Sequence, residues 1–157
     1  MQIMQWETVF SVANTWPLLF WLLLAVGPRT ELTAKLVLFG GIFPLALSYA
    51  VLLPMIMTGV IDPVGPEGGV VSFTELSGIM ALFDSKGGAT VGWIHYLAFD
   101  LFVGLWVARN ADRHGYARWV QVPILFLILM AGPFGLALYL LLRFTCKNHP
   151  QNATVPT

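Results

Sequence analysis

Two ionisable side chains, His95 and Asp100, occur in a stretch of otherwise large apolar residues. A carboxylate at the centre of a bilayer costs at least about 2.5 to 3.5 kcal/mol on insertion scales. Asp100 should therefore face the interior of a helical bundle and meet hydrogen-bond donors there. An acid and a base held near a bound substrate can transfer protons to it and from it. Asp100 and His95 are therefore the candidate catalytic residues.

The spacing around Asp100 divides this stretch into two helix faces. At about 100° per residue, Trp93 and Tyr96 share one face with Asp100. His95 lies on another face, about 140° away. The two candidate catalytic residues therefore do not hydrogen-bond within their own helix. Either they line a wide cavity from two sides of that helix, or each faces a different neighbour.

Several polar or helix-interrupting residues in the other apolar stretches fall at about the depth of Asp100, counted from the ends of each stretch. These residues are Asn14, Ser48, Tyr49, Gly132 and Pro133. Pro133 frees a backbone carbonyl one turn earlier, and Gly132 lets another backbone or a ligand approach closely. Together with Trp93 and Tyr96, they are the candidate substrate-binding residues of a polar, lipid-open pocket. The alternative is that they satisfy Asp100 and hold helices together without binding a substrate.

The composition indicates that the elements carrying these residues lie in a membrane. Of 157 residues, 57% are hydrophobic and 10% are charged, whereas an average soluble domain is about 25% charged. Four apolar stretches, residues 6–26, 34–60, 89–108 and 119–144, reach the length of about 20 residues that crosses a bilayer. They do not alternate as barrel strands do. We predict an all-α integral membrane protein with one four-helix domain, residues 1–146, and a polar tail, residues 147–157.

The long connection between the second and third spans contains a short amphipathic segment. Ser72 and Glu75 fit the S-x-x-E capping box, and apolar residues follow at helical spacing as far as Asp84. We expect a helix over about residues 72–84 at the membrane surface. It would serve either as an anchor for the connection or as a lid over a lipid-accessible cavity.

The distribution of Lys and Arg predicts the orientation of the spans. Five of these residues flank the first and third turns, whereas three lie at the opposite end, together with five acidic residues. Short loops rich in Lys and Arg favour the cytoplasmic side. Both termini are therefore predicted on the non-cytoplasmic side of a bacterial inner membrane or a thylakoid-type membrane. The start of the chain lacks the basic region of a cleaved signal, so the first span is expected to remain in the mature protein.

Several kinds of ligand are not expected. The formal net charge of zero argues against a nucleic-acid partner. Three histidines and one cysteine are too few for a multi-histidine metal centre or an internal disulfide, and no Gly-rich phosphate loop occurs. We therefore predict no metal and no cofactor. Ligation of a pigment by His95 stays open, because a histidine in a membrane can bind haem or chlorophyll.

Residues 93–102, followed by residues 132–136 with Tyr139 and Arg143, resemble the abscisic-acid-deficient-four family of plant plastid proteins linked to neoxanthin synthesis. The resemblance extends over essentially the whole chain. It implies a small integral membrane protein that converts a xanthophyll epoxide, such as violaxanthin, into the allenic alcohol neoxanthin. Because the sequence shows no plastid transit peptide, it resembles a bacterial or cyanobacterial member of that family.

Three functions fit these residues and this resemblance. The first is a carotenoid-modifying isomerase, which opens an epoxide to an allene or interconverts cis and trans isomers by acid and base chemistry alone. The second is a pigment-binding or assembly subunit of a membrane complex. The third is a proton or small-solute pathway, which would need several copies of the chain because the sequence shows no internal repeat. The expected partners are a carotenoid or other long apolar ligand, the lipid bilayer and, in a homo-oligomer, further copies of this chain.

Overall fold

The computed structural model describes residues 5–62 and 72–145, and all regular structure in these ranges is helical. The elements are α1 (Trp6–Val26), α2 (Glu31–Lys35), the π-helix η1 (Leu36–Ile42), α3 (Phe43–Met57), α4 (Leu76–Phe83), α5 (Lys86–Arg113), α6 (Arg118–Met130) and α7 (Gly132–Thr145). The predicted all-α class is confirmed. The polar tail predicted over residues 147–157 lies outside the described residues.

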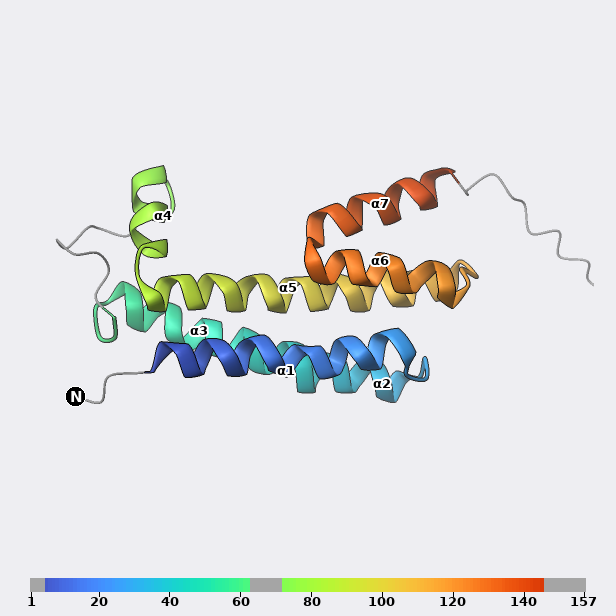
Figure 1. Cartoon of the computed structure of the whole chain (residues 1–157), viewed down its shortest axis with the longest axis horizontal. Helices are drawn as coiled ribbons and strands as arrows, with labels where there is room; N and C mark the ends of the chain where they lie inside the picture. Colours follow the sequence, from blue (N-terminus) through green and yellow to red (C-terminus); the bar gives the residue numbers. More distant parts are fainter. Residues whose placement is uncertain (1–4, 63–71, 146–157) are drawn as a thin grey trace, which may run out of the picture.

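Three long helices form the body of the molecule (Figure 1). They are α1, the continuous run of α2, η1 and α3, and α5, with 21, 27 and 28 residues. Within the described residues, these three are long and apolar enough to cross a membrane. Hydropathy predicts both ends of α1 correctly. It places the second helix three residues too late and makes α5 too short at both ends.

α5 lies at the centre because small and apolar residues line its buried side. Leu101, Val107 and Ala108 are 0% exposed. Gly104 lies directly against the ring of Trp21 on α1, so that a Cβ atom there would collide with the ring. This close approach lets α1 and α5 pack side by side.

The second long helix changes its neighbour along its length. At η1, Gly40 and Gly41 lie against the ring of Phe20 on α1, and Trp16 Nε1 donates a hydrogen bond to the Gly40 carbonyl at 2.9 Å. Beyond η1, α3 packs mainly on α5. A π-helical segment is rare and often lies beside a functional site. Here it marks the point where the helix leaves α1 and a groove opens between α1 and α3.

The prediction of one continuous fourth span over residues 119–144 is wrong. The structure divides this stretch into α6 and α7, with 13 and 14 residues. The chain leaves the helix at Ala131, with φ −157° and ψ 77°, two residues before Pro133, which has no N–H to continue the hydrogen bonds of α6. α7 then folds back along α6 (Figure 1), where Gly135 lies against the backbone of Ile128. The result is a helical hairpin whose turn meets the middle of α5.

This hairpin also changes where the first and last described helices begin and end relative to each other. Because α7 runs back toward the C-terminal end of α5, the start of α1 and the end of α7 lie at opposite ends of the long helices (Figure 1). Four complete spans would place both termini on one side of the membrane, as the sequence predicts. The orientation of the molecule in a membrane stays a prediction.

The predicted short helix before α5 is present, but it starts four residues later than expected. Ser72 does not cap it, because the Ser72 hydroxyl contacts the Thr74 hydroxyl at 2.9 Å and accepts from the Thr74 N–H at 3.3 Å. Glu75 is the N-cap residue of α4 and makes no side-chain cap. α4 lies across the end of the long helices (Figure 1) and exposes Leu76 and Met80. This placement fits an interfacial anchor, whereas a lid function stays a prediction.

Candidate functional site

Asp100 lies in the middle of α5, where the α6–α7 hairpin turns. Its side chain is 6% exposed, and its carboxyl packs so closely on Gly132 that a Cβ atom there would collide with it. The Tyr96 hydroxyl and the backbone N–H of Gly132 are its polar neighbours. Asp100 Oδ2 is buried and has no hydrogen-bond partner among the described residues. Asp100 thus faces the bundle interior, as the sequence predicts, and the structure adds its direct contact with Gly132.

The position of Gly132 gives Asp100 a structural role. Gly132 is the first residue of α7, and the first N–H groups of a helix have no partner within the helix itself. A carboxyl oxygen can accept a hydrogen bond from such an N–H group whether or not the carboxyl carries its proton. Asp100 therefore contacts the N-terminus of α7 from a different helix and stabilises the hairpin turn.

A row of side chains leads from Asp100 to the surface of the bundle. Tyr96 lies one turn before Asp100 and donates a hydrogen bond to the Met130 carbonyl at 3.1 Å. The Trp93 ring stacks on the Tyr96 ring at 5.2 Å, and Trp93 Nε1 donates to Asn14 Oδ1 at 3.0 Å. Trp93 is 39% exposed, so the row reaches the outside. We call this group the Asp100 cluster; its members are Asn14, Trp93, Tyr96, Asp100 and Gly132.

His95 does not belong to the Asp100 cluster. Its ring stacks on Phe99 at 4.6 Å and contacts the ring of Tyr49 on α3 at 5.1 Å. His95 and Asp100 therefore face different neighbours, which is one of the two arrangements that the helix geometry allows. The structure does not bring the predicted acid and base together. Pro133 directly follows Gly132 at the start of α7 and is exposed.

Ser48 lies in the groove between α1 and α3, which has a volume of about 360 Å³. Its hydroxyl donates to the Pro44 carbonyl of the preceding turn at 2.8 Å. Apart from the hydroxyls of Thr8 and Ser48 and the indole N–H of Trp16, the lining side chains are apolar, and Ile94 of α5 also lines the groove. Such a groove fits an apolar chain, but it is separate from the Asp100 cluster.

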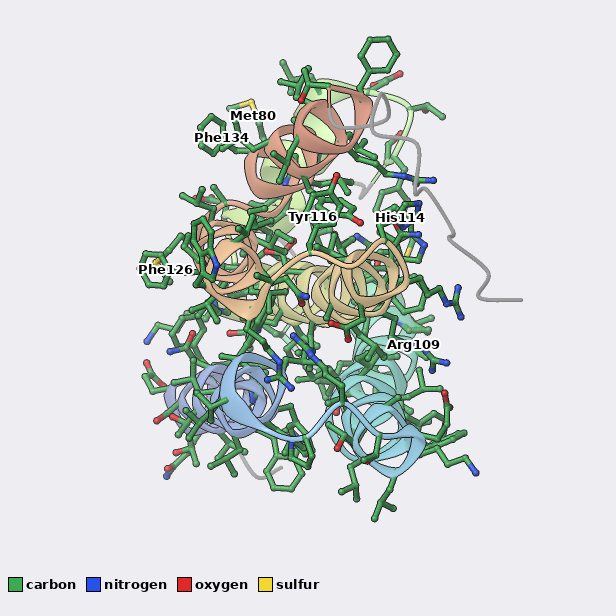
Figure 2. All side chains as sticks on the ribbon, turned by 90° about the vertical axis from the view of Figure 1, so that its right-hand side faces the viewer. Met80, Arg109, His114, Tyr116, Phe126 and Phe134 are labelled. Carbon is green, nitrogen blue, oxygen red and sulfur yellow. The ribbon has the colours of Figure 1, made fainter. Side chains whose placement is uncertain are left out.

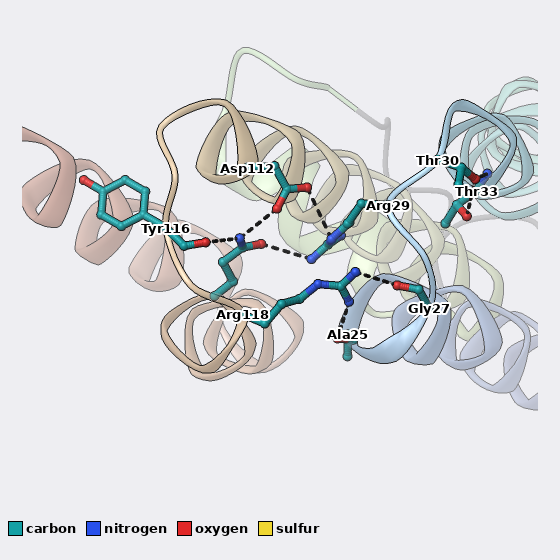
Figure 3. A network of polar contacts seen from close by, with 9 residues as sticks. Ala25, Gly27, Arg29, Thr30, Thr33, Asp112, Tyr116 and Arg118 are labelled. Atoms are coloured by element: carbon teal, nitrogen blue, oxygen red, sulfur yellow. Dashed lines mark hydrogen bonds and ion pairs between the residues drawn. The ribbon is translucent and has the colours of Figure 1, made fainter. Parts of the chain in front are cut away.

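A second polar network, which the sequence reasoning missed, lies where the α1–α2 turn meets the α5–α6 turn (Figure 3). Gln121 is 1% exposed, and its Oε1 accepts a hydrogen bond from Arg29 Nη2 at 3.0 Å. Its Nε2 donates to Asp112 Oδ1 at 2.8 Å and to the Tyr116 carbonyl at 2.7 Å. Arg29 Nε forms an ion pair with Asp112 Oδ2 at 3.4 Å. A lone glutamine in the apolar stretch of α6 was the sequence signal for this network.

Two arginines at this end of the molecule, Arg29 and Arg118, are held by polar contacts and are partly buried. Arg118 donates to the carbonyls of Ala25 and Gly27 at 3.3 and 2.8 Å (Figure 3), and so satisfies groups left open at the end of α1. Partial burial lowers the pKa of the Arg29 guanidinium, the Asp112 carboxylate acts in the opposite direction, and Arg118 lowers it further. An arginine nevertheless keeps its proton in a protein. Arg29 is therefore a fixed cation.

Residues 8–139 match the ABA4-like family, which is described as ABA DEFICIENT 4-like. The matched range includes the whole Asp100 cluster and the Gln121 network. A comparison with curated proteins finds no match, and neither does a comparison with solved structures.

Proposed function

This chain belongs to the ABA DEFICIENT 4-like family, and on that premise we propose that it is an integral membrane protein that isomerises a carotenoid or xanthophyll at the Asp100 cluster. One observation carries the proposal. The buried Asp100 carboxyl has an oxygen without a hydrogen-bond partner among the described residues. The adjacent Tyr96 ring stacks on Trp93, which is exposed at the surface of the bundle.

The surface around Tyr96 suits a substrate that arrives from the lipid. A carotenoid dissolves in the bilayer, so it needs an apolar approach rather than a water-filled cleft. Trp93, Met130 and Phe134 are exposed, and Phe134 points away from the bundle (Figure 2). The stacked rings of Trp93 and Tyr96 provide a flat apolar face against which a conjugated chain can pack.

The isomerisation moves one proton and changes no oxidation state. A protonated Asp100 gives its proton to the epoxide oxygen, with the Tyr96 hydroxyl as the intermediate donor, while the C–O bond opens. The Asp100 carboxylate then accepts a proton from the polyene carbon as the allene forms. One carboxyl group thus acts as acid and base in turn. Cis–trans isomerisation follows the same pattern, because protonation of the polyene and later loss of that proton allow rotation between the two events.

This scheme assigns no step to His95. Sequence reasoning made His95 the base, but its ring lies against Tyr49 and Phe99. Tyr96 is the better partner for Asp100, because it lies on the same helix face and its hydroxyl neighbours the carboxyl.

The first test is pigment analysis of a carotenoid-producing host with and without the chain. We expect a new pigment with the same mass as its precursor and a changed absorption spectrum, because an isomerisation adds and removes no atoms. Pigments that stay unchanged while the protein accumulates in the membrane would contradict the proposed activity.

The groove between α1 and α3 supports a second candidate function, the binding of a pigment without chemistry. Its mostly apolar lining would hold a linear chain. Val12 lines the groove and is 61% exposed, so Val12→Trp fills the groove without disturbing the core. If the chain only binds pigment, Val12→Trp should lower the amount of pigment that purifies with it, and no new pigment should form in the host.

A further inference from the structure

A pocket of about 200 Å³ lies at the end of the long helices, beside the Gln121 network. Its charged lining residues are Arg29, Arg109, Arg113, Glu31 and Asp112. Three guanidinium groups are thus balanced by only two carboxylates. Arg118 lies close enough to Arg29 to add to the positive potential. The pocket therefore favours an anion.

The three arginines of this pocket differ in how they are held. Arg29 is fixed by Gln121 and Asp112, and its side chain is 17% exposed. Arg109 Nη2 pairs with Glu31 Oε1 at 2.8 Å in an exposed ion pair. Arg113 forms no ion pair within residues 5–62 and 72–145. Each guanidinium has five N–H donors, so donors remain for a ligand on at least Arg109 and Arg113.

The shape of the pocket adds an apolar requirement. Leu24, Ala34 and Leu105 also line it, so that it has apolar walls next to its charged groups. It lies at the end of α1 and α5, where the headgroups of a bilayer would surround the molecule if these helices cross it. A group at this level that is anionic and rich in acceptor oxygens is a phosphate, which guanidinium groups bind in forked pairs.

We propose that this pocket binds a phosphate group, carried by an anionic phospholipid headgroup or free in solution. Arg109 and Arg113 contact the phosphate directly, and Arg29, held by Gln121 and Asp112, lines the pocket. The proposal does not depend on the Asp100 cluster or on carotenoid chemistry.

The test uses the full chain purified in a neutral detergent. Phosphatidylglycerol is titrated in one arm and inorganic phosphate in the other, and binding is followed by native mass spectrometry and by the shift in melting temperature. Arg113→Gln should weaken binding by about tenfold, the size expected for one charge-assisted contact. Arg113 makes no ion pair in the described ranges, so this variant should keep its fold. Arg109→Gln is the second variant.

Lys86→Gln is the control matched to Arg109→Gln. Each variant removes an exposed cation from an ion pair, but the pair of Lys86 with Glu7 lies at the other end of α5. Binding of phosphatidylglycerol alone assigns the pocket to a lipid headgroup, and saturation by inorganic phosphate assigns it to free phosphate. The proposal is overturned if neither binds, if both arginine variants bind like the parent, or if Lys86→Gln weakens binding as much as they do.

Discussion

The contact between Asp100 and Gly132 joins the middle of α5 to the turn of the α6–α7 hairpin. A Cβ atom at Gly132 would collide with the Asp100 carboxyl. Gly132→Ala should therefore lower the free energy of unfolding by about 1 to 3 kcal/mol, which is the usual cost of overpacking a core. Unfolding of the purified protein in detergent, followed by circular dichroism, measures this change.

A double variant shows whether that contact is the cause. Asp100→Ala removes the carboxyl that the new methyl group would meet, so the double variant should be more stable than expected from the two single variants. If the two effects simply add, the collision with Asp100 is not the source of the loss.

At the scale of single residues, the sequence predicts positions better than partners. The cost of a charge in lipid predicts that Asp100 is buried, and counting along the spans places Gly132 at the same depth. The hydrogen bond from Tyr96 to the Met130 carbonyl could not be predicted. That carbonyl is free only because the chain reverses at Ala131, and the reversal depends on tertiary contacts.

At the scale of elements, Tyr139 holds α7 to α5. It is 1% exposed, and its hydroxyl donates to Asn110 Oδ1 at 2.6 Å. Tyr139→Phe should lower the unfolding free energy by about 1 kcal/mol, because it leaves the Asn110 oxygen without its donor. Tyr49→Phe is the matched control, since the Tyr49 hydroxyl makes no hydrogen bond within the described part of the chain. An equal loss in both variants would show that the bond to Asn110 does not stabilise the hairpin.

The hairpin is also the element that sequence reasoning could not predict. Residues 119–144 are apolar throughout, and apolarity is the same for a complete span and for two shorter helices that fold back on each other. Proline and glycine occur in continuous spans as well, so Pro133 alone predicts only a kink. The close contacts of Gly132 with Asp100 and of Gly135 with Ile128 accompany the reversal, and each joins residues that lie on different elements.

At the scale of the whole molecule, the hairpin separates the charges. α7 carries Arg143 back to the end that also holds five other basic residues, namely Arg29, Lys35, Arg109, Arg113 and Arg118 (Figure 1). Lys86 lies at the opposite end, with Glu7, Asp62, Glu75 and Asp84. Among the described residues, six Lys and Arg side chains thus lie at the Arg143 end and one lies at the other end. This difference predicts that the Arg143 end faces the cytoplasm.

Cysteine labelling in intact cells tests this topology. Single cysteines replace Asp84, His114 or Arg143 in a background without Cys146, the one natural cysteine. A membrane-impermeant maleimide should label Asp84→Cys from outside, whereas His114→Cys and Arg143→Cys should react only after the cells are opened. Labelling of Arg143→Cys together with Asp84→Cys would contradict the hairpin and restore a complete fourth span.

The pigments of host cells that express Asp100→Asn show whether the Asp100 carboxyl performs the proton transfers. An amide keeps the shape of the side chain but cannot supply the acid. We expect the isomer to disappear with Asp100→Asn, while Asp84→Asn, the same change at an exposed position, leaves it in full amount at equal protein levels. Undiminished product with Asp100→Asn would show that this carboxyl performs neither proton transfer.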